Sequence, residues 1–405
     1  MNPILPLDCF VPDGEVHFMP DGRAYLYGSW DLKDVQEYCS NRYHVFSSAD
    51  LVHWVDHGES LSIENELLWA PDCIGKDGKY YLYACTSGGG EVTAVCDSPA
   101  GPFTDMKPLN FADGKGIDPC VFVDDDGQGY YFWGQIALKG ARLNPDMRSI
   151  DESSVTWNIL TEEAHGFHEG SSIRKINGTY YMVYTDISRG RATCLSYATS
   201  DKPLGPYTKR GVIIDNTFCD PNSWNNHGSI EMINGQLYVF YHRSSRNGVF
   251  SRRMCAERLT MLPDGSIPEV RMSVNGVEPP LDAFKRLEAS RASRICCDGG
   301  YITTDEVLPE RLTKLRGNTF RYGICEYRTL DFGSGASGFE VCVKGKGIIK
   351  VCQDDRTEAA VMEIDSPDDF TVCSVKYPFK GGAHSAVLLI DSSEGLDIRT
   401  IRFTK

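Results

Sequence analysis

The sequence predicts an all-β protein, a five-bladed β-propeller followed by a β-sandwich domain. Two observations predict the propeller: a hairpin pattern that recurs about every 50 residues, and a constant offset between each hairpin and a polar or aromatic residue before it. A third, the change to short alternating strands in the last part of the chain, predicts the sandwich. A propeller blade is a small antiparallel sheet, so one repeated hairpin per blade is expected.

The recurring hairpin is clearest in HGFHEGSSIRKINGTYYMVYTD, residues 165–186. Two strand-like runs flank Asn177-Gly178, a pair that suits the positive φ angles of a type I′ turn. Related hairpins occur at 20–29, 76–87, 125–134 and 233–243. Their turn glycines are Gly22, Gly78, Gly127, Gly178 and Gly235. Five copies predict five blades.

A second regularity is found nine positions before each turn glycine. The residues there are Asp13, Trp69, Asp118, Glu169 and Asn226, the last followed by His227. Equivalent positions in successive blades lie at equivalent places around the propeller axis. We therefore expect three carboxylates, Asp13, Asp118 and Glu169, to converge at one end of the central channel.

The domain boundaries follow from the change of pattern. Residues 1–275 are assigned to the propeller, and residues 276–286, which contain a Pro-Pro pair, to a linker. Residues 287–405 alternate apolar and polar positions in short strands around glycine turns, as β-sandwich sequences do.

Composition limits the partners and the cellular compartment that we expect for the protein. The net charge of −15 argues against nucleic acid and anionic membranes as partners. The N-terminus lacks the basic and long apolar regions of a signal peptide. The 15 cysteines are scattered without metal-binding spacing, which favours reduced thiols. These features predict a cytoplasmic protein, and they leave its oligomeric state open.

Three converging carboxylates indicate acid–base chemistry. Hydrolysis of a glycosidic bond needs one carboxylic acid to protonate the departing oxygen and one carboxylate on the other side of the sugar. When the second group activates water, the anomeric configuration inverts. A third carboxylate close by raises the pKa of the acid, because like charges disfavour ionisation. Asp13, Asp118 and Glu169 can fill these three roles.

The motifs that hold these residues resemble glycoside hydrolase family 43. They are NPILPLDCFVPDGEVHF, WAPD, GIDPCVFVDDDGQGYYFWG, HEGSSIRKINGTYYMVYTD and HGSIEMINGQLYVFYHR, in the family's order from residue 1 to about 270. The resemblance implies a five-bladed inverting hydrolase of arabinose- and xylose-containing glycans. It assigns Asp13 as general base, Asp118 as pKa modulator and Glu169 as general acid. The family's first motif is usually Asp-Pro, whereas Gly14 follows Asp13 here.

The resemblance also implies binding residues. His227 resembles a central histidine that lies beside water or calcium on the propeller axis, and Arg243 resembles an arginine that contacts sugar hydroxyls. No cofactor is required, and calcium would be structural. Each residue has a plainer interpretation, His227 as a buried satisfied histidine and Arg243 as a structural ion-pair partner.

Position suggests further pocket residues. Trp69, at the start of an inner strand, is a candidate wall for sugar stacking, although it could equally belong to the core. Trp30, Asp31 and His168 are further candidate pocket residues.

The C-terminal part resembles a family 6 carbohydrate-binding module, through RLEASRASRI, YRTLDFGSGASGFEV and LDIRTIRF. Such modules usually present a tryptophan to sugar, but no tryptophan follows Trp224, and Phe370 stands near the expected place. Glycan binding and a purely structural role are both open for this domain.

Together these observations predict an inverting exo-glycosidase acting on oligosaccharides. The expected product is a terminal pentose, α-L-arabinofuranose or β-D-xylose. A β-galactosidase-type member of the same family and a non-catalytic glycan-binding propeller are the alternatives. A retaining fructan-type hydrolase is disfavoured, because its Asp-Pro-Asn-Gly sequence is absent near the N-terminus.

Overall fold

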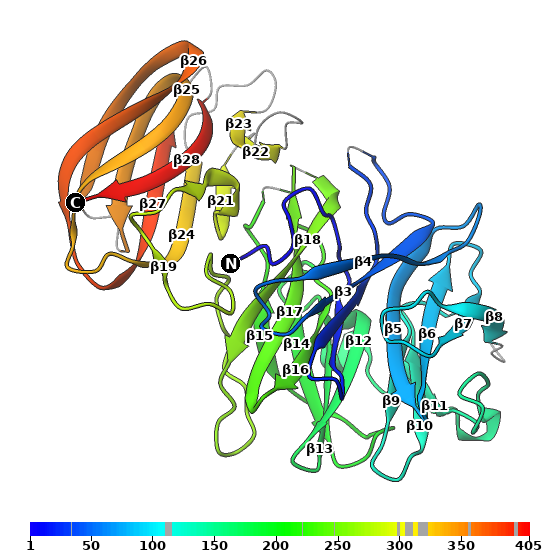
Figure 1. Ribbon diagram of the computed structural model, residues 1–405. Coiled ribbons are helices and arrows are strands. Elements are labelled where there is room, and N and C mark those ends of the chain that lie inside the picture. Colours follow the sequence, from blue (N-terminus) through cyan, green and yellow to red (C-terminus); the bar gives the residue numbers. More distant parts are fainter. Residues whose placement is uncertain are drawn as a thin grey trace.

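The computed structural model describes residues 1–405 except 34, 110–115, 221, 247, 298–299, 304–310, 315–322, 355–357 and 393–395. The chain folds into a five-bladed propeller and a second β domain, seen at the lower right and upper left of Figure 1. The predicted fold class is therefore confirmed.

Each blade is an antiparallel sheet whose strands follow chain order. Blade one contains β1 (Glu15–Phe18), β2 (Ala24–Gly28), β3 (Arg42–Ser48) and β4 (Val55–Ser62). Blade two contains β5 (Leu68–Lys76), β6 (Lys79–Thr86), β7 (Glu91–Cys96) and β8 (Thr104–Leu109). Blade three contains β9 (Cys120–Val123), β10 (Gly129–Trp133) and β11 (Lys139–Arg142).

Two short helices, η1 (Glu152–Ser154) and α1 (Glu162–His165), lie between blades three and four. Blade four contains β12 (Phe167–Ile176), β13 (Thr179–Asp186), β14 (Cys194–Ser200) and β15 (Thr208–Asp215). Blade five contains β16 (Gly228–Ile233), β17 (Gln236–Ser245) and β18 (Gly248–Leu259).

The repeated hairpins have the predicted turn geometry. Asn177 and Gly178 have φ angles of 51° and 83°, so both residues of the turn adopt the left-handed conformation that a type I′ hairpin requires. Asp77-Gly78 and Asn234-Gly235 do the same. This shared turn chemistry explains why the hairpins could be recognised from the sequence.

The inner strands form a closed ring. β1 contacts β5, β5 contacts β9, β9 contacts β12, β12 contacts β16, and β16 returns to β1. A parallel bridge between Gly14 and Gly228 joins the first and last blades directly. The ring therefore has five members, as the hairpin count predicted.

Apolar side chains fill the space between each pair of neighbouring blades. Val16 of blade one and Phe240 of blade five share one buried cluster, and corresponding clusters lie between the other pairs. Blades are twisted sheets that cannot bury both faces alone, so each depends on its neighbours.

The propeller axis is filled by a buried polar network below the mouth of the channel. Arg174 on β12 donates to Glu15 on β1 and to Glu231 on β16. His17 on β1 hydrogen-bonds Asp72 on β5 at 2.7 Å, and the other Asp72 oxygen accepts the Val121 N–H from β9. Every inner strand thus joins one network.

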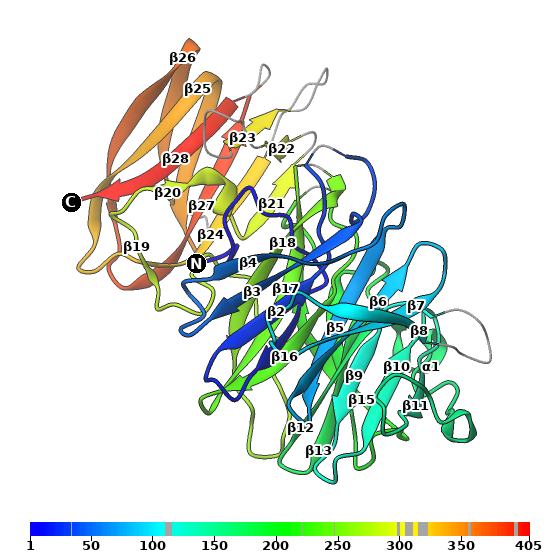
Figure 2. The same cartoon turned by 45° about the vertical axis from the view of Figure 1, so that its right-hand side comes forward.

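The N-terminal segment closes the propeller. Ile4 donates its N–H to the Met254 carbonyl on β18, so the first residues lie along the last strand of blade five. The Asn2 side chain is fully buried; its Nδ2 donates to Ala256 O, Glu257 Oε1 and Ser273 O, and its Oδ1 accepts from Ala256 N–H. Figures 1 and 2 place this terminus at the junction of the two domains.

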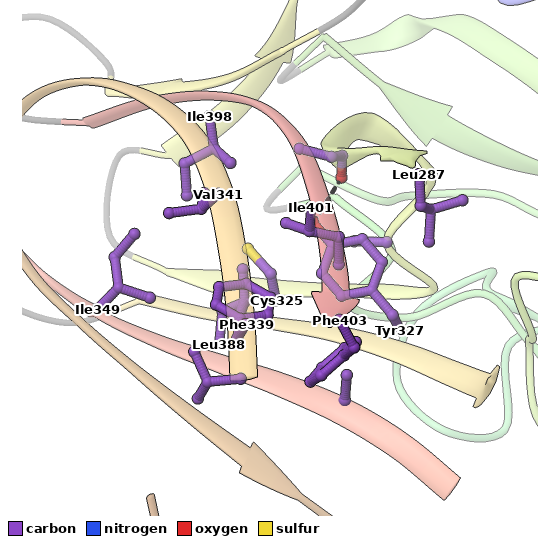
Figure 3. Packing of buried hydrophobic residues seen from close by; sticks show 14 of the residues in the cluster. Leu287, Cys325, Tyr327, Phe339, Val341, Ile349, Leu388, Ile398, Ile401 and Phe403 are labelled. Carbon is purple, nitrogen blue, oxygen red and sulfur yellow. Dashed lines mark hydrogen bonds between the residues drawn. The ribbon is translucent and has the colours of Figure 1, made fainter. Parts of the chain in front are cut away.

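The second domain is a curled, mostly antiparallel sheet with β-sandwich character. Its strands are β19 (Leu281–Asp282), β20 (Leu287–Glu288), β21 (Arg294–Cys297), β22 (Gly300–Thr303), β23 (Arg311–Lys314), β24 (Gly323–Asp331), β25 (Ala336–Gln353), β26 (Ala359–Phe379), β27 (Ala383–Asp391) and β28 (Leu396–Thr404), with η2 (Ala289–Arg291) after β20. The long strands enclose an apolar core that includes Phe339, Leu388 and Phe403 (Figure 3).

The predicted linker, residues 276–286, is built into the second domain. Leu281 and Asp282 pair in parallel with Leu330 and Asp331 on β24. Ala283, and Val274 just before the segment, belong to the core of that domain. The two domains are therefore joined by a packed segment and not by a free tether.

All 14 cysteines whose side chains are described are free thiols, as the sequence led us to expect. No helix among the described residues has the length and apolar character needed to cross a membrane.

We expect Asn2→Ala to destabilise the propeller by about 2 kcal/mol, because it leaves buried main-chain groups of β18 and Ser273 without partners. The shift of the urea unfolding midpoint measures this cost. Asp8→Ala, an exposed change in the same segment, is the control and should alter stability by less than about 0.5 kcal/mol. Equal midpoints for the two variants would contradict the assigned role of Asn2.

Candidate active site

A pocket of about 270 Å³ opens at the end of the channel where the inner strands begin. It is lined by Asp13, Tyr38, Cys39, Trp69, Ile117, Asp118, Gln135, His168, Glu169, Trp224, Asn225, His227 and Arg252. The structure thus brings together the three predicted carboxylates with Trp69, His168 and His227. Each lies at or just before the first residues of an inner strand, and for Asp13, Trp69, Asp118 and Glu169 this common position explains the shared offset in the sequence.

The backbone turns sharply where the carboxylates enter the pocket. Asp13 and Asp118 have φ angles of 57° and 54°, in the left-handed region, and Gly170 after Glu169 has 63°. Non-glycine residues adopt this conformation uncommonly and at some energetic cost, although aspartate tolerates it better than most. The same local turn in different blades directs their carboxylates toward a common centre.

Asp13 is a buried, ionised carboxylate. Arg252 Nη1 donates to its Oδ1 at 2.9 Å, and the Ser29 hydroxyl donates to its Oδ2 at 2.7 Å. Burial alone would raise the pKa of Asp13, but the Arg252 charge and the other neighbours outweigh it and hold the pKa below its ordinary value. Asp13 is therefore suited to accept a proton at neutral pH.

His242 fixes the backbone of Asp13. The Asp13 N–H donates to His242 Nδ1 at 3.2 Å, so the ring proton is on Nε2, which donates to Asn225 Oδ1 at 3.1 Å. Burial and the nearby Arg252 charge lower the pKa of His242 to about 3, which keeps the ring neutral. A neutral ring in this tautomer matches both hydrogen bonds.

Asp118 and Glu169 form a coupled acidic pair. Asp118 Oδ2 accepts the Gly170 N–H at 3.1 Å, next to Glu169 in the chain. Burial, followed by the negative charges of Glu169 and Asp13, raises the pKa of Asp118 well above its ordinary value. Glu169 is half-buried, and its Oε2 accepts a hydrogen bond from Gln135 Nε2 at 2.8 Å. Burial and the neighbouring negative charges therefore favour the protonated form of Asp118.

Packing explains the glycine that replaces the family's usual proline after Asp13. A side-chain carbon at position 14 would lie 1.9 Å from the Met254 methyl group and 2.8 Å from Leu26. Met254 occupies this space, and Asp13 keeps its place in the pocket.

His227 lies next to Asp13, and its Nδ1 is 3.7 Å from Asp13 Oδ1. Calcium prefers six to eight oxygen ligands, whereas His227 offers nitrogen. The described carboxylates nearest the axis already accept protein hydrogen bonds; they are Asp13, Glu15, Asp72 and Asp118. These residues do not form a calcium cage. A second group, Glu15, His17 and Asp72, brings ligand atoms within 4.8 Å, but Arg174 and main-chain donors already satisfy it.

Arg252 is the principal site residue that the sequence analysis missed. Besides Asp13 it binds Asp31, through Nη2 to Oδ1 at 2.9 Å and Nε to Oδ2 at 3.0 Å. The Arg252 guanidinium lies over the ring of Tyr38, 4.8 Å from its centroid, and Tyr38 lines the pocket. Two adjacent arginines, Arg252 and Arg253, directly before the apolar residues Met254 to Ala256 were the available signal, because buried charges in a strand need partners.

Three predicted pocket residues lie elsewhere. Arg243 is buried at the domain junction, where Nη1 donates to Ala292 O at 2.7 Å and Nη2 to Ser290 O at 3.0 Å. Trp30 stacks on His44, with ring centroids 4.0 Å apart. Asp31 stands behind Arg252 and does not line the pocket.

The comparisons with known proteins decide the family. The model for glycosyl hydrolases family 43 matches residues 1–267. The chain belongs to glycosyl hydrolases family 43. A xylosidase/arabinosidase of Thermoclostridium stercorarium is 34% identical to this glycoside hydrolase over 75% of the chain and 74% of the relative. An arabinoxylan arabinofuranohydrolase of Bacillus subtilis (strain 168) is 30% identical, covering 90% of the chain and 81% of the relative.

Solved family 43 structures share the architecture of this hydrolase. One is a calcium-free beta-xylosidase/alpha-arabinofuranosidase from a compost microbial metagenome, in complex with xylotriose. It is 32% identical with a TM-score of 0.59, and covers 67% of this chain and 97% of its own. Another is a Bacillus subtilis arabinoxylan arabinofuranohydrolase in complex with cellotetraose, 26% identical with a TM-score of 0.59. It covers 100% of this chain and 97% of its own, so the match includes the second domain.

We expect Gly170→Ala to lower kcat/KM of the hydrolase by on the order of 100-fold, because small displacements of reacting groups have effects of that size. A methyl group there would meet the His227 ring at 2.9 Å, at a φ of 63° that disfavours alanine, next to Glu169. Steady-state kinetics on a cleaved oligosaccharide measure the loss. Gly211→Ala in the same blade has open space around it and should retain wild-type activity. Full activity of Gly170→Ala would show that this turn does not position the site.

Proposed function

We propose that this family 43 hydrolase is an inverting exo-glycosidase that releases a terminal pentose, α-L-arabinofuranose or β-D-xylose, from oligosaccharides. The observation that carries the proposal is the meeting of Asp13, Asp118 and Glu169 in one pocket, where Arg252 donates to Asp13 and holds its pKa low while burial raises the pKa of Asp118. The named activities of its relatives on xylose and arabinose glycans support the choice of sugar.

Asp13 acts as the general base. It remains ionised because of Arg252, and its oxygens keep lone pairs for a water molecule beyond the Arg252 and Ser29 hydrogen bonds. It takes one proton from this water as the water oxygen attacks the anomeric carbon. Attack from the face opposite the leaving group inverts the configuration.

Glu169 acts as the general acid. It is the least buried of the three carboxyl groups, so its place toward the pocket mouth suits contact with the departing oxygen. Gln135 holds Oε2, and among the described residues no hydrogen bond occupies Oε1. Glu169 protonates the leaving-group oxygen as the glycosidic bond breaks.

Asp118 acts as the pKa modulator, and the Gly170 N–H holds its carboxyl group beside the acid. As its neighbour Glu169 gives up the proton to the substrate, the two carboxyl groups share the resulting negative charge with Gly170 N–H as a fixed donor. Trp69, His168 and His227 line the remaining walls and contact the sugar.

The pocket shape favours removal of a terminal residue. The polar network around Arg174 fills the axis beneath the carboxylates, so a chain cannot pass through the channel. A cavity of about 270 Å³ is small for more than one sugar ring beside the carboxylates. An end of the glycan therefore enters the pocket.

The first experiment compares wild type with Asp13→Asn on a short α-1,5-arabino-oligosaccharide and a xylo-oligosaccharide. We expect monosaccharide release by the wild type and a loss of more than about 1,000-fold in the variant, which lacks the base. Proton NMR of the first-formed product should show the inverted anomer. Undiminished turnover by Asp13→Asn would refute the assigned site. Absence of wild-type turnover on both would favour a galactoside-type substrate or a binding propeller.

The pH profile tests the role of Arg252. Because its charge lowers the pKa of Asp13, Arg252→Ala should raise that pKa. Activity requires ionised Asp13, so the acidic limb of kcat/KM should move to higher pH. Arg252→Lys keeps the charge and should move the limb less. An unchanged limb in Arg252→Ala, with the variant folded by circular dichroism, would contradict the proposed base.

A further inference from the structure

One loop connects the pocket to the second domain. It comprises residues 216–226, of which position 221 is not described, and we call it the 216–226 loop. It runs from the end of β15 to the start of β16. Phe218, near its beginning, contacts the second domain, whereas Trp224 and Asn225, near its end, line the pocket.

Trp224 stands at the mouth of the pocket. Its side chain is 41% exposed, whereas Asp13 and Asp118 at the bottom are 5% and 6% exposed. A terminal sugar held by the buried carboxylates therefore directs its glycosidic bond outward, toward Trp224. The Arg191 guanidinium lies over the Trp224 ring, 5.8 Å from its centroid, which leaves the opposite flat face of the exposed indole for the next sugar of the chain, the leaving group.

The second domain holds the other part of the same loop. Ile295 on β21 donates its N–H to the Phe218 carbonyl. The Arg294 guanidinium, also on β21, lies over the Phe218 ring, 5.4 Å from its centroid. Phe218 is 48% exposed, and these two contacts join it to β21.

Hydrogen bonds within the loop link its two parts. Asn216 Nδ2 donates to Asn225 O and to His242 O, both at 2.7 Å. The Ser223 hydroxyl, next to Trp224, donates to Asn216 O at 3.2 Å. These bonds connect the Phe218 end of the loop with the Trp224 end. His242 also holds the Asp13 backbone, so the loop shares its support with the base.

We infer that the second domain is a positioning element of the active site: through β21 it holds the 216–226 loop, whose Trp224 binds the leaving-group sugar of the oligosaccharide. This rests on the proposed glycosidase function and adds a role for the second domain that needs no glycan site of its own. Trp224 contacts substrate, whereas Phe218 and Arg294 are positioning residues.

The test compares two substrates of the same sugar. One is the xylo- or arabino-oligosaccharide that the wild type cleaves; the other is the corresponding glycosyl fluoride, which has no leaving-group sugar. Trp224→Ala should lower kcat/KM for the oligosaccharide about tenfold, mainly through KM, because stacking of one ring is lost. Its kcat/KM for the fluoride should stay within about twofold of wild type.

Arg294→Ala tests the second domain, far from the chemistry. It should reproduce the same pattern more weakly, with kcat/KM for the oligosaccharide about threefold lower and the fluoride unchanged. Arg294→Lys keeps a cation over Phe218 and should restore most of the loss. Arg402→Ala, which removes an ion pair with Glu340 on the same domain, is the matched control. It should leave kcat/KM unchanged for both substrates.

The outcomes separate the two proposals. Absence of wild-type turnover on every substrate refutes the proposed glycosidase function and this inference with it. Wild-type turnover with Trp224→Ala equal to wild type on the oligosaccharide refutes the inference alone. Equal losses on both substrates would also refute it, because they would mark a general disturbance of the pocket. If Arg294→Ala has the wild-type kcat/KM for the oligosaccharide, the proposed role of the second domain is refuted.

Discussion

The buried ion pair between Arg252 and Asp13 is the interaction on which both the ring and its pocket depend. Arg252 comes from the last strand of the propeller, β18, whereas Asp13 and Asp31 come from the first blade. Two carboxylates and one guanidinium are removed from water there, which is favourable only when the geometry satisfies every charge. The closure of the propeller and the ionisation of Asp13 thus depend on the same contact.

The same pair shows what the sequence could and could not predict. A repeat fixes how far along each blade a residue lies, so Asp13, Asp118 and Glu169 could be placed in one pocket without a structure. Arg252 lies outside the repeated hairpin. It is the cross-strand neighbour of Ser244, whereas Arg243 pairs with Arg253, and adjacent residues of a strand point to opposite faces. Arg243 and Arg252 lie on neighbouring strands. Deciding which of them reaches the pocket therefore required the register of these strands in the structure.

Loops limited the prediction in a similar way. Trp30 and Asp31 follow β2, and their directions depend on contacts with His44 and Arg252 that are distant in sequence. Residues 276–286 were assigned to a linker because of their glycine and prolines, and in the structure Ala283 of this segment and the preceding Val274 enter an apolar core. Local composition describes the chain, but long-range packing decides whether a segment is free.

The filled axis has a consequence for the order in which products depart. Arg174 and its partners leave the carboxylate pocket with one opening. In the proposed exo-acting mechanism, the sugar nearest the bottom is covered by the remainder of the glycan until the bond breaks, so the shortened chain must diffuse away before the freed monosaccharide can follow. Under this mechanism each cycle ends with release of the whole oligosaccharide, and successive residues are removed in separate encounters.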